Sequence, residues 1–160
     1  MKDNIIIYTD GGCRGNPGLG AWASILISEK YNLRLEIGES EEMTTNNKME
    51  MKAVIKALER LKNSHNIKVY SDSAYLVNGM NGWIYTWQKN NWIKSDKKPV
   101  ENKKYWLKLI ELSKKHNIEF IKVKGHSDNK ENNRADEIVN ILMDEHENTG
   151  NIASFYNKIN

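Results

Sequence analysis

Four acidic residues stand where strands end or helices begin, and side chains at such positions can converge on one site. Asp10 closes the apolar run IIIYTD and Asp72 closes NIKVYSD, whereas Glu50 and Asp136 each lie beside a core position at the start of a helical pattern. If these carboxylates meet at one end of a sheet, their mutual repulsion is costly unless a cation neutralises it. Carboxylate oxygens are ligands that the hard cations Mg²⁺ and Mn²⁺ prefer.

Each of these acids has a simpler explanation when it is taken alone. Asp10 and Asp72 can cap turns, and Glu50 and Asp136 can be first-turn acids favoured by the helix dipole. Residue type and position alone favour these local roles over a metal site. A shared role therefore needs support from the sequence around each acid.

The elements that must position these acids follow from the hydrophobic pattern. The chain predicts the order βββαβααβα, with one helix broken near Gly79 and restarted near Trp83. The expected strands cover residues 5–10, 21–28, 33–38, 66–72 and 118–124. The expected helices cover residues 47–61, 73–83, 101–116 and 134–146.

This order predicts a mixed α/β (α+β) fold in a single domain. We expect a five-stranded mixed sheet, with three antiparallel strands followed by two parallel strands, flanked by helices. The domain should span residues 1–146, with a protruding basic segment at about 80–104 and a polar, frayed tail at 147–160. A chain of 160 residues is long enough to fold alone without disulfides.

Positive charge and aromatic side chains are concentrated in one stretch. The net charge of the whole chain is only +3, but residues 83–104 contain six lysines and two acids. The same stretch holds three of the five tryptophans, Trp83, Trp87 and Trp92. This combination favours a surface that binds nucleic acid.

The remaining bulk features point to an intracellular protein. Cys13 is the single cysteine, so an intramolecular disulfide is excluded. The start MKDNIIIYTD has too short an apolar run for a signal sequence or a membrane span. We therefore expect a monomer in the reducing cytoplasm, with no membrane association.

Five local motifs surround the acids and share one family resemblance. In order, they are YTDGGCRGNPG, TTNNKMEMKAVIKAL, YSDSAYLVNG, VKGHSD and NNRADEIV. In order and rough spacing they resemble the type 1 ribonucleases H of bacteria and eukaryotes, from about Ile5 to Met143. The resemblance implies a ribonuclease H-like fold and an endonuclease that cuts the RNA strand of RNA/DNA hybrids, leaving 5′-phosphate and 3′-hydroxyl ends.

By similarity to that family, the four acids hold two Mg²⁺ ions, for which Mn²⁺ can substitute. Asp10 is expected to bridge both ions, Glu50 and Asp72 to hold the leaving-group ion, and Asp136 the nucleophile-side ion. His126 in VKGHSD matches a residue thought to shuttle protons or to help product and metal leave. The expected catalytic set is therefore Asp10, Glu50, Asp72, His126 and Asp136.

The resemblance also assigns contacts with the hybrid, whose RNA strand alone carries 2′-hydroxyl groups. The positions that match substrate contacts fall in the glycine-rich segment, at the start of the first helix and in the basic stretch. Asn16, Asn46, Glu50 and the backbone at Cys13 match contacts with RNA-strand hydroxyls, and Asn47 matches a contact with the neighbouring DNA strand. The DNA strand is expected to pass Tyr75, Trp83 and Trp87, with Thr45 and Asn102 taking a phosphate. The remaining expected contacts are Trp92, Lys97 and Lys98.

Alternatives remain open from the sequence. Trp87 and Trp92 can equally be the hydrophobic seam of a protruding helix, and Met43 replaces an arginine of well-known members, which weakens the expected DNA phosphate pocket. The chain could also be a non-catalytic module that binds hybrids or double-stranded RNA. Another metal-dependent nuclease or integrase-like enzyme on the same fold is the third possibility.

Overall fold

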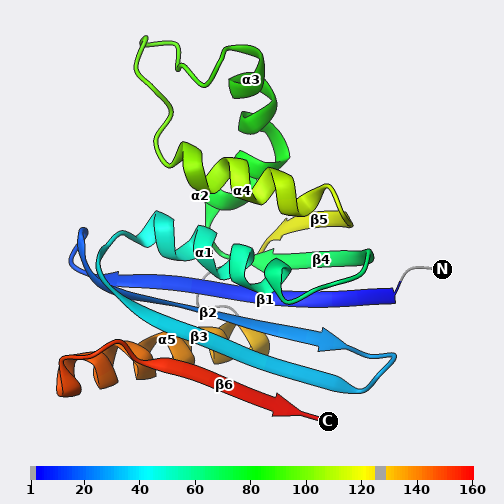
Figure 1. Cartoon of the computed structure of the whole chain (residues 1–160), viewed down its shortest axis with the longest axis vertical. Helices are drawn as coiled ribbons and strands as arrows, with labels where there is room; N and C mark the ends of the chain where they lie inside the picture. The colour runs from blue at the N-terminus through cyan, green and yellow to red at the C-terminus, as the bar shows by residue number, and fades with distance from the viewer. Residues whose placement is uncertain (1–2, 125–128) are drawn as a thin grey trace.

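A six-stranded mixed sheet forms the centre of the molecule (Figure 1). The computed structural model describes residues 3–124 and 129–160. Strand order across the sheet is β5-β4-β1-β2-β3-β6, with β4 and β5 parallel to β1 and the remaining pairs antiparallel. The strands are β1 (Asp3–Arg14), β2 (Gly18–Ser28), β3 (Leu33–Thr44), β4 (His65–Ser71), β5 (Asn117–Lys122) and β6 (Ser154–Ile159).

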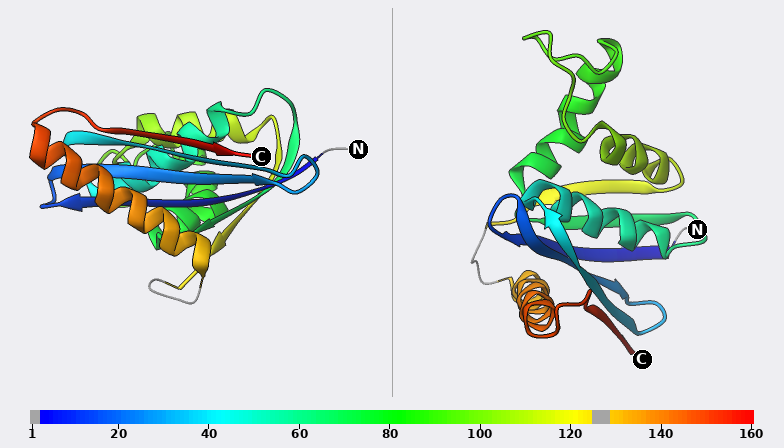
Figure 2. Two further views of the ribbon diagram at one scale, coloured as in Figure 1. Left: turned by 90° about the horizontal axis from the view of Figure 1, so that it is seen from below. Right: turned by 60° about the vertical axis from the view of Figure 1, so that its left-hand side comes forward.

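Alternation along the strands divides the apolar side chains between the two faces of the sheet. On β1, Ile5 and Ile7 belong to the larger core, whereas Tyr8 packs with the smaller core that contains Ile25 and Ile138. Helices cover both faces (Figure 2). They are α1 (Asn46–Glu59), α2 (Ala74–Asn78), α3 (Ile84–Lys89), α4 (Lys103–Ser113) and α5 (Lys130–Thr149).

The glycine-rich segment after Asp10 differs from its prediction as a turn. Gly11, Gly12 and Cys13 continue β1 and pair with residues 20–22 of β2, so the turn comes only at residues 15–17. Antiparallel pairing satisfies the backbone groups of this segment, which its composition does not reveal. Asp10 therefore lies within a strand, opposite Ala23, rather than at the end of one.

The protruding segment begins where the second predicted helix is interrupted. A π-helical turn, η1 (Gly79–Trp83), joins α2 directly to α3. A Cβ at Gly79 would lie 2.6 Å from Cζ3 of Trp106, so glycine permits close packing of this turn on α4. Figure 1 shows α3 and the loop after it projecting beyond α4 at the top of the molecule.

The expected frayed tail and the count of five strands are wrong. Helix α5 runs to Thr149 and ends at Gly150, whose φ of 73° reverses the chain direction. The chain then forms β6 against β3. Near its start, the Ser40 amide donates to the Ala153 carbonyl, and the Ala153 amide donates to the Ser40 hydroxyl. The predominantly polar composition hid this strand, because only Phe155 packs against the core beneath α5.

Within the described part of the chain, no helix is both long enough and apolar enough to cross a membrane.

Candidate active site

Three of the four predicted carboxylates meet beside β1. Asp10 comes from β1, Glu50 from the first turns of α1, and Asp72 from the residue after β4. One oxygen of each carboxylate lies within 4.8 Å of the others. The parallel pairing of β1 with β4 places Tyr8 opposite Tyr70, so Asp10 and Asp72, each two residues further along, lie side by side.

Gly11 determines how closely α1 approaches this site. A Cβ at residue 11 would lie 2.5 Å from the carbonyl carbon of Met49 and would also collide with the amide nitrogen of Glu50. The backbones of β1 and α1 are therefore in direct contact beside the carboxylates. Thr45 starts the helix at this point, because its hydroxyl accepts a hydrogen bond from the Lys48 amide at 3.2 Å.

The cluster is strongly perturbed electrostatically. Burial raises the pKa of Asp10 to about 8, with further increases from the negative charges of Asp72 and Asp136. Burial also raises the pKa of Glu50 well above its usual value, and the charges of Asp10 and Asp72 add to this effect. The Gly11 amide donates to both Asp10 and Glu50 and offsets only part of the increase.

This donor set fits a divalent cation. Oε1 of Glu50 is buried and has no hydrogen-bond partner among the described residues. A buried carboxylate oxygen that lacks a hydrogen-bond partner and lies among other negative charges destabilises the folded chain. A hard cation would coordinate this oxygen and neutralise the repulsion between the carboxylates. Asp10, Glu50 and Asp72 are the residues that can hold it.

Asp136 approaches the cluster from the opposite face of the sheet. It lies on α5, outside the three-carboxylate group, but its side chain is hydrogen-bonded to Asp10 and raises the pKa of that carboxyl. The four acids are thus brought together as the sequence predicts, with Asp10 between Asp136 and the other two.

Asn132 helps to place α5 beside the cluster, a contribution that sequence reasoning missed. Its Nδ2 donates to the carbonyl oxygens of Thr9 on β1 and Tyr70 on β4, each at 3.4 Å. These are the strands that carry or precede Asp10 and Asp72. The motif NNRADEIV contained this signal, but only the acid in it was assigned a role.

A network of charged side chains also connects α5 to β3. Glu36 is almost fully buried and accepts hydrogen bonds from Arg34, Arg134 and Asn157. Burial alone would raise the pKa of Glu36, but these three donors lower it to about 2. Arg34 also bridges to Glu131 on the first turn of α5 at 2.5 Å. The network joins β3, β6 and α5, and its long sequence separations left no local signal.

The predicted RNA-strand contacts gather where the β1–β2 turn meets α1. Oδ1 of Asn16 accepts a hydrogen bond from the Asn46 amide at 3.2 Å. Sγ of Cys13 lies 3.2 Å from the carbonyl oxygen of Thr44, one residue before the helix cap. Asn47, the predicted contact with the neighbouring DNA strand, follows within the first turn of α1. Polar groups from two distant segments therefore share one surface beside the carboxylates.

Aromatic side chains form a continuous row from α2 into the protrusion. Tyr75 contacts both Trp83 and Trp106, with ring centroids 5.9 and 5.2 Å apart, and Trp83 contacts Trp87 at 5.8 Å. Trp83 is 40% exposed, whereas Trp106 is fully buried. The amide of Asn102 donates to the Tyr75 hydroxyl at 3.1 Å, so the predicted phosphate contact lies next to the row.

Trp92 is buried where the loop returns to α3. Its amide donates to the Trp87 carbonyl, and its indole contacts the Trp87 ring at 5.9 Å. Trp92 therefore packs as expected for the hydrophobic seam of the protruding helix. Trp87 is half-buried and also borders a groove.

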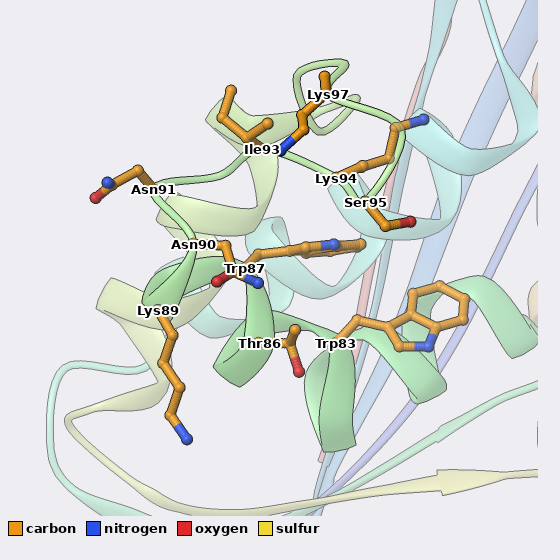
Figure 3. Close-up of a pocket in the computed structure, with 10 residues that line it drawn as sticks. All are labelled: Trp83, Thr86, Trp87, Lys89, Asn90, Asn91, Ile93, Lys94, Ser95 and Lys97. Atoms are coloured by element: carbon orange, nitrogen blue, oxygen red, sulfur yellow. The ribbon is translucent and has the colours of Figure 1, made fainter.

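The groove between α3 and the following loop has a volume of about 900 Å³ (Figure 3). Trp83 and Trp87 lie along it, and Lys89, Lys94 and Lys97 contribute positive charge. Lys98 is exposed on the same loop but does not line the groove. The predicted combination of aromatic faces and lysines is therefore present on one surface. His126, the remaining predicted catalytic residue, lies outside the described residues.

Comparison with known proteins identifies the family. The model of the RNase H family matches residues 2–142. The chain belongs to the ribonuclease H family. It is 53% identical over 150 residues to a ribonuclease H of Caldanaerobacter subterraneus, covering 91% of this chain and 97% of that protein. It is 51% identical over 146 residues to the ribonuclease H of Chlorobaculum parvum, covering 91% and 99%.

Solved structures support the same assignment for the fold. LC11-RNase H1, crystallised in complex with an RNA/DNA hybrid, is 31% identical with a TM-score of 0.68, and the match covers 89% of this chain and 99% of that one. LC9-RNase H1, described as a type 1 RNase H with the type 2 active-site motif, has a TM-score of 0.82 at 22% identity, with coverage of 97% and 79%. The predicted ribonuclease H-like fold is confirmed.

The ribonuclease H family is metal-dependent, and this member contains the carboxylate cluster that such chemistry requires. The prediction that these acids share one site agrees with their placement.

Proposed function

We propose that the chain is an endonuclease that hydrolyses the RNA strand of RNA/DNA hybrids and leaves 5′-phosphate and 3′-hydroxyl ends. The observation that carries the proposal is the group formed by Asp10, Glu50 and Asp72, in which Glu50 is buried and has an unpartnered oxygen, in a member of the ribonuclease H family. The hybrid bound to a relative 31% identical to this chain supports the choice of substrate.

Two Mg²⁺ ions, for which Mn²⁺ can substitute, are proposed to bind the four carboxylates. When bound, they would supply an activated water and neutralise charge at the leaving oxygen. Asp10 would contribute to both ions, Glu50 and Asp72 to one, and Asp136 to the other. This division agrees with the position of Asp10 between Asp136 and the other two acids.

Recognition of the RNA strand is assigned to the surface where the β1–β2 turn meets α1. The side-chain amides of Asn16 and Asn46 and the backbone at Cys13 can donate to and accept from 2′-hydroxyl groups, and Glu50 can accept from one. Because a DNA strand lacks that hydroxyl, these contacts select the strand that is cut. The hydrogen bond between Asn16 and Asn46 holds two of these residues in one place. Asn47 is assigned to the neighbouring DNA strand.

The DNA strand is assigned to the aromatic row and the protrusion. Deoxyribose can pack against the exposed faces of Tyr75, Trp83 and Trp87, while Thr45 and Asn102 are proposed to bind one phosphate. The hydrogen bond from Asn102 to Tyr75 supports a shared role for these two residues.

Lys97 and Lys98 are proposed to add electrostatic attraction to the phosphate backbone. Trp92 acts mainly through the packing that holds Trp87 beside the groove. His126 is proposed to transfer protons or to assist product release, so the variant His126→Ala should slow turnover without abolishing it. A complete loss of activity at saturating Mn²⁺ would contradict an auxiliary role.

We also propose that the chain works as one catalytic domain, monomeric and cytoplasmic. The single sheet, which includes β6, supports one domain, and the single cysteine is consistent with a reducing compartment.

A gel assay tests the proposed function. Labelled RNA/DNA, RNA/RNA and DNA/DNA duplexes of one sequence are incubated with the protein in Mg²⁺ or in EDTA. We expect cleavage of the RNA strand of the hybrid alone, only with Mg²⁺, and none with Asp10→Asn. Hybrid binding by Asp10→Asn should persist. Binding without cleavage by the parent protein in Mg²⁺ and Mn²⁺ would instead indicate a non-catalytic module, and cleavage of DNA/DNA would indicate another nuclease.

A further inference from the structure

Helices α1 and α4 form a second groove, separate from the one in the protrusion. The two helices pack against each other and run in the same direction (Figure 1). The groove between them has a volume of about 780 Å³ and shares no lining residue with the groove of Figure 3. The contacts proposed for the protrusion therefore leave this groove without a role.

Positive charge predominates along both walls of this groove. Its lining contains five lysines and two glutamates, namely Lys52, Lys56 and Glu59 from α1 and Lys103, Lys104, Lys108 and Glu111 from α4. Lys52 is paired with Glu41 of β3, which leaves four lysines for the two glutamates. Lys52 and Lys56, like Lys104 and Lys108, are four residues apart, which is about 6 Å along a helix. Cationic groups therefore recur along the length of the groove.

The other four lysines are only partly neutralised within the protein. Lys103 and Lys104 are exposed and form no ion pair within residues 3–124 and 129–160. Lys56 and Lys108 share one carboxylate, that of Glu59, at 3.6 and 3.9 Å. Exposed ion pairs of this length contribute little to stability, so both cations are available to an external anion.

The groove begins beside the phosphate contact proposed for the DNA strand. Thr45 caps the start of α1, and Asn102 immediately precedes α4. Because the two helices run in the same direction, the groove leads away from these two residues towards the far ends of both helices. A strand whose phosphate is bound by Thr45 and Asn102 can therefore continue into the groove.

The dimensions and the lining of the groove favour a single strand. The axes of packed helices are separated by about 8–10 Å, so the space between them is too narrow to admit a double helix. On the α4 wall, Leu107 is 44% exposed and Tyr105 is half-buried, and such surfaces can contact unpaired bases. An acidic peptide would satisfy the same cations, but the connection to the DNA-strand contact favours nucleic acid.

We propose that the groove between α1 and α4 binds single-stranded DNA that continues the DNA strand of the hybrid beyond its paired region. The inference rests on the proposed binding of that strand at Thr45 and Asn102. The paired part of the hybrid would hold the tail near the groove, so weak contacts with Lys56 and Lys104 would add measurably to the affinity. The enzyme would therefore prefer hybrids that end in single-stranded DNA to hybrids with blunt ends.

Fluorescence anisotropy with labelled hybrids tests this groove. One hybrid has blunt ends, and the others carry a tail of about six thymidines at the 5′ or the 3′ end of the DNA strand, or a uridine tail of the same length on the RNA strand. Binding is measured in EDTA, which keeps the RNA intact. We expect one of the two DNA tails to tighten binding about three- to tenfold. The same tail should steepen the salt dependence of the affinity by about 0.7 in logarithmic slope for each phosphate contacted.

Paired lysine variants distinguish this groove from general electrostatic attraction. The double variant Lys56→Gln/Lys104→Gln removes one cation from each wall and should remove most of the gain from the tail. The matched control, Lys62→Gln/Lys114→Gln, removes the same charge at exposed positions shortly after α1 and α4 that do not line the groove, and it should keep the gain. Cleavage of the blunt hybrid in Mg²⁺ by the groove variant should match the parent rate, which also shows that the variant is folded.

Four outcomes would overturn the inference. These are no gain from either DNA tail, an equal gain from the tail on the RNA strand, a full gain in Lys56→Gln/Lys104→Gln, and an equal loss of the gain in Lys62→Gln/Lys114→Gln. If the parent protein still binds and cleaves the blunt hybrid, such a result refutes only the groove and the proposed function stands. Failure to bind or cleave the blunt hybrid would instead refute the proposed function, together with the strand contact on which the groove depends.

Discussion

Replacing Asp10 by asparagine should stabilise the metal-free protein while it abolishes cleavage. The amide has nearly the shape of the carboxyl group but no charge, so it removes repulsion from Asp72 and Asp136 and the cost of burying an ion. The pKa of Asp10 is raised from 3.8 to about 8 in the folded chain. The contribution of Asp10 to the free energy of unfolding is therefore greatest below about pH 3.8, where the carboxyl group is protonated in both states. This contribution is lost progressively as the pH rises towards 8.

The magnitude follows from the interval between the unfolded pKa and the working pH. At pH 7 that interval is about 3 units, and each unit corresponds to about 1.36 kcal/mol, which gives about 4 kcal/mol. This is an upper limit, because the carboxylates share the repulsion. The free energy of unfolding of Asp10→Asn should then exceed that of the parent by about 2–4 kcal/mol at pH 7 and by less than about 1 kcal/mol at pH 4.

Urea unfolding in EDTA, followed by circular dichroism at both pH values, measures this difference. The control Asp144→Asn removes an exposed carboxylate paired with Arg14 and should change stability by less than about 1 kcal/mol. Added Mg²⁺ should stabilise the parent more than Asp10→Asn, since ligands that bind the folded state shift its stability. Equal stability of parent and Asp10→Asn at pH 7, or an equal difference at pH 4, would refute the electrostatic reasoning.

Three other perturbations test separate features. Glu36→Gln should lower the free energy of unfolding by about 2–3 kcal/mol at pH 7. Because the pKa of Glu36 is about 2, this loss should shrink as the pH falls from 4.5 towards 2. A loss in urea unfolding that does not depend on pH would contradict this reasoning. Gly79→Ala should destabilise the protein by about 1–3 kcal/mol, because the added methyl group collides with the Trp106 indole. Gly82→Ala should have little effect, because nothing lies within 4 Å of a Cβ at that position. Thermal unfolding of the two variants compares them. Replacing Lys97 and Lys98 by alanine should raise KM for hybrid and reduce its salt dependence, and an unchanged salt slope in steady-state assays would argue against phosphate contacts.

The sequence predicted the parts of the site that depend on local order along the chain. Asp10 and Asp72 follow short apolar runs, and Glu50 opens an amphipathic helix, so strand and helix geometry bring them to one place. The aromatic and basic residues of the protrusion were close in sequence and remain close in space. Their prediction needed only local patterns and the family motifs.

Features that depend on distant pairing were not predictable in this way. The contact between Arg34 and Glu131 joins residues 97 positions apart, and β6 finds its partner only after Gly150 reverses the chain. In residues 154–159 only Phe155 packs against the core, while Tyr156 and Ile159 are exposed, so no regular hydrophobic pattern marks the strand that pairs with β3.

The backbone contact at Gly11 limits which substitutions this protein can accept during evolution. Since main-chain atoms of β1 and α1 meet there, the spacing of Asp10 and Glu50 is set independently of the size of the side chains packed further along the helix. Substitutions in the interior can therefore alter thermal tolerance while the chemistry is preserved. Residue 11, by contrast, has almost no freedom to vary, because even a methyl group would push the helix off the strand.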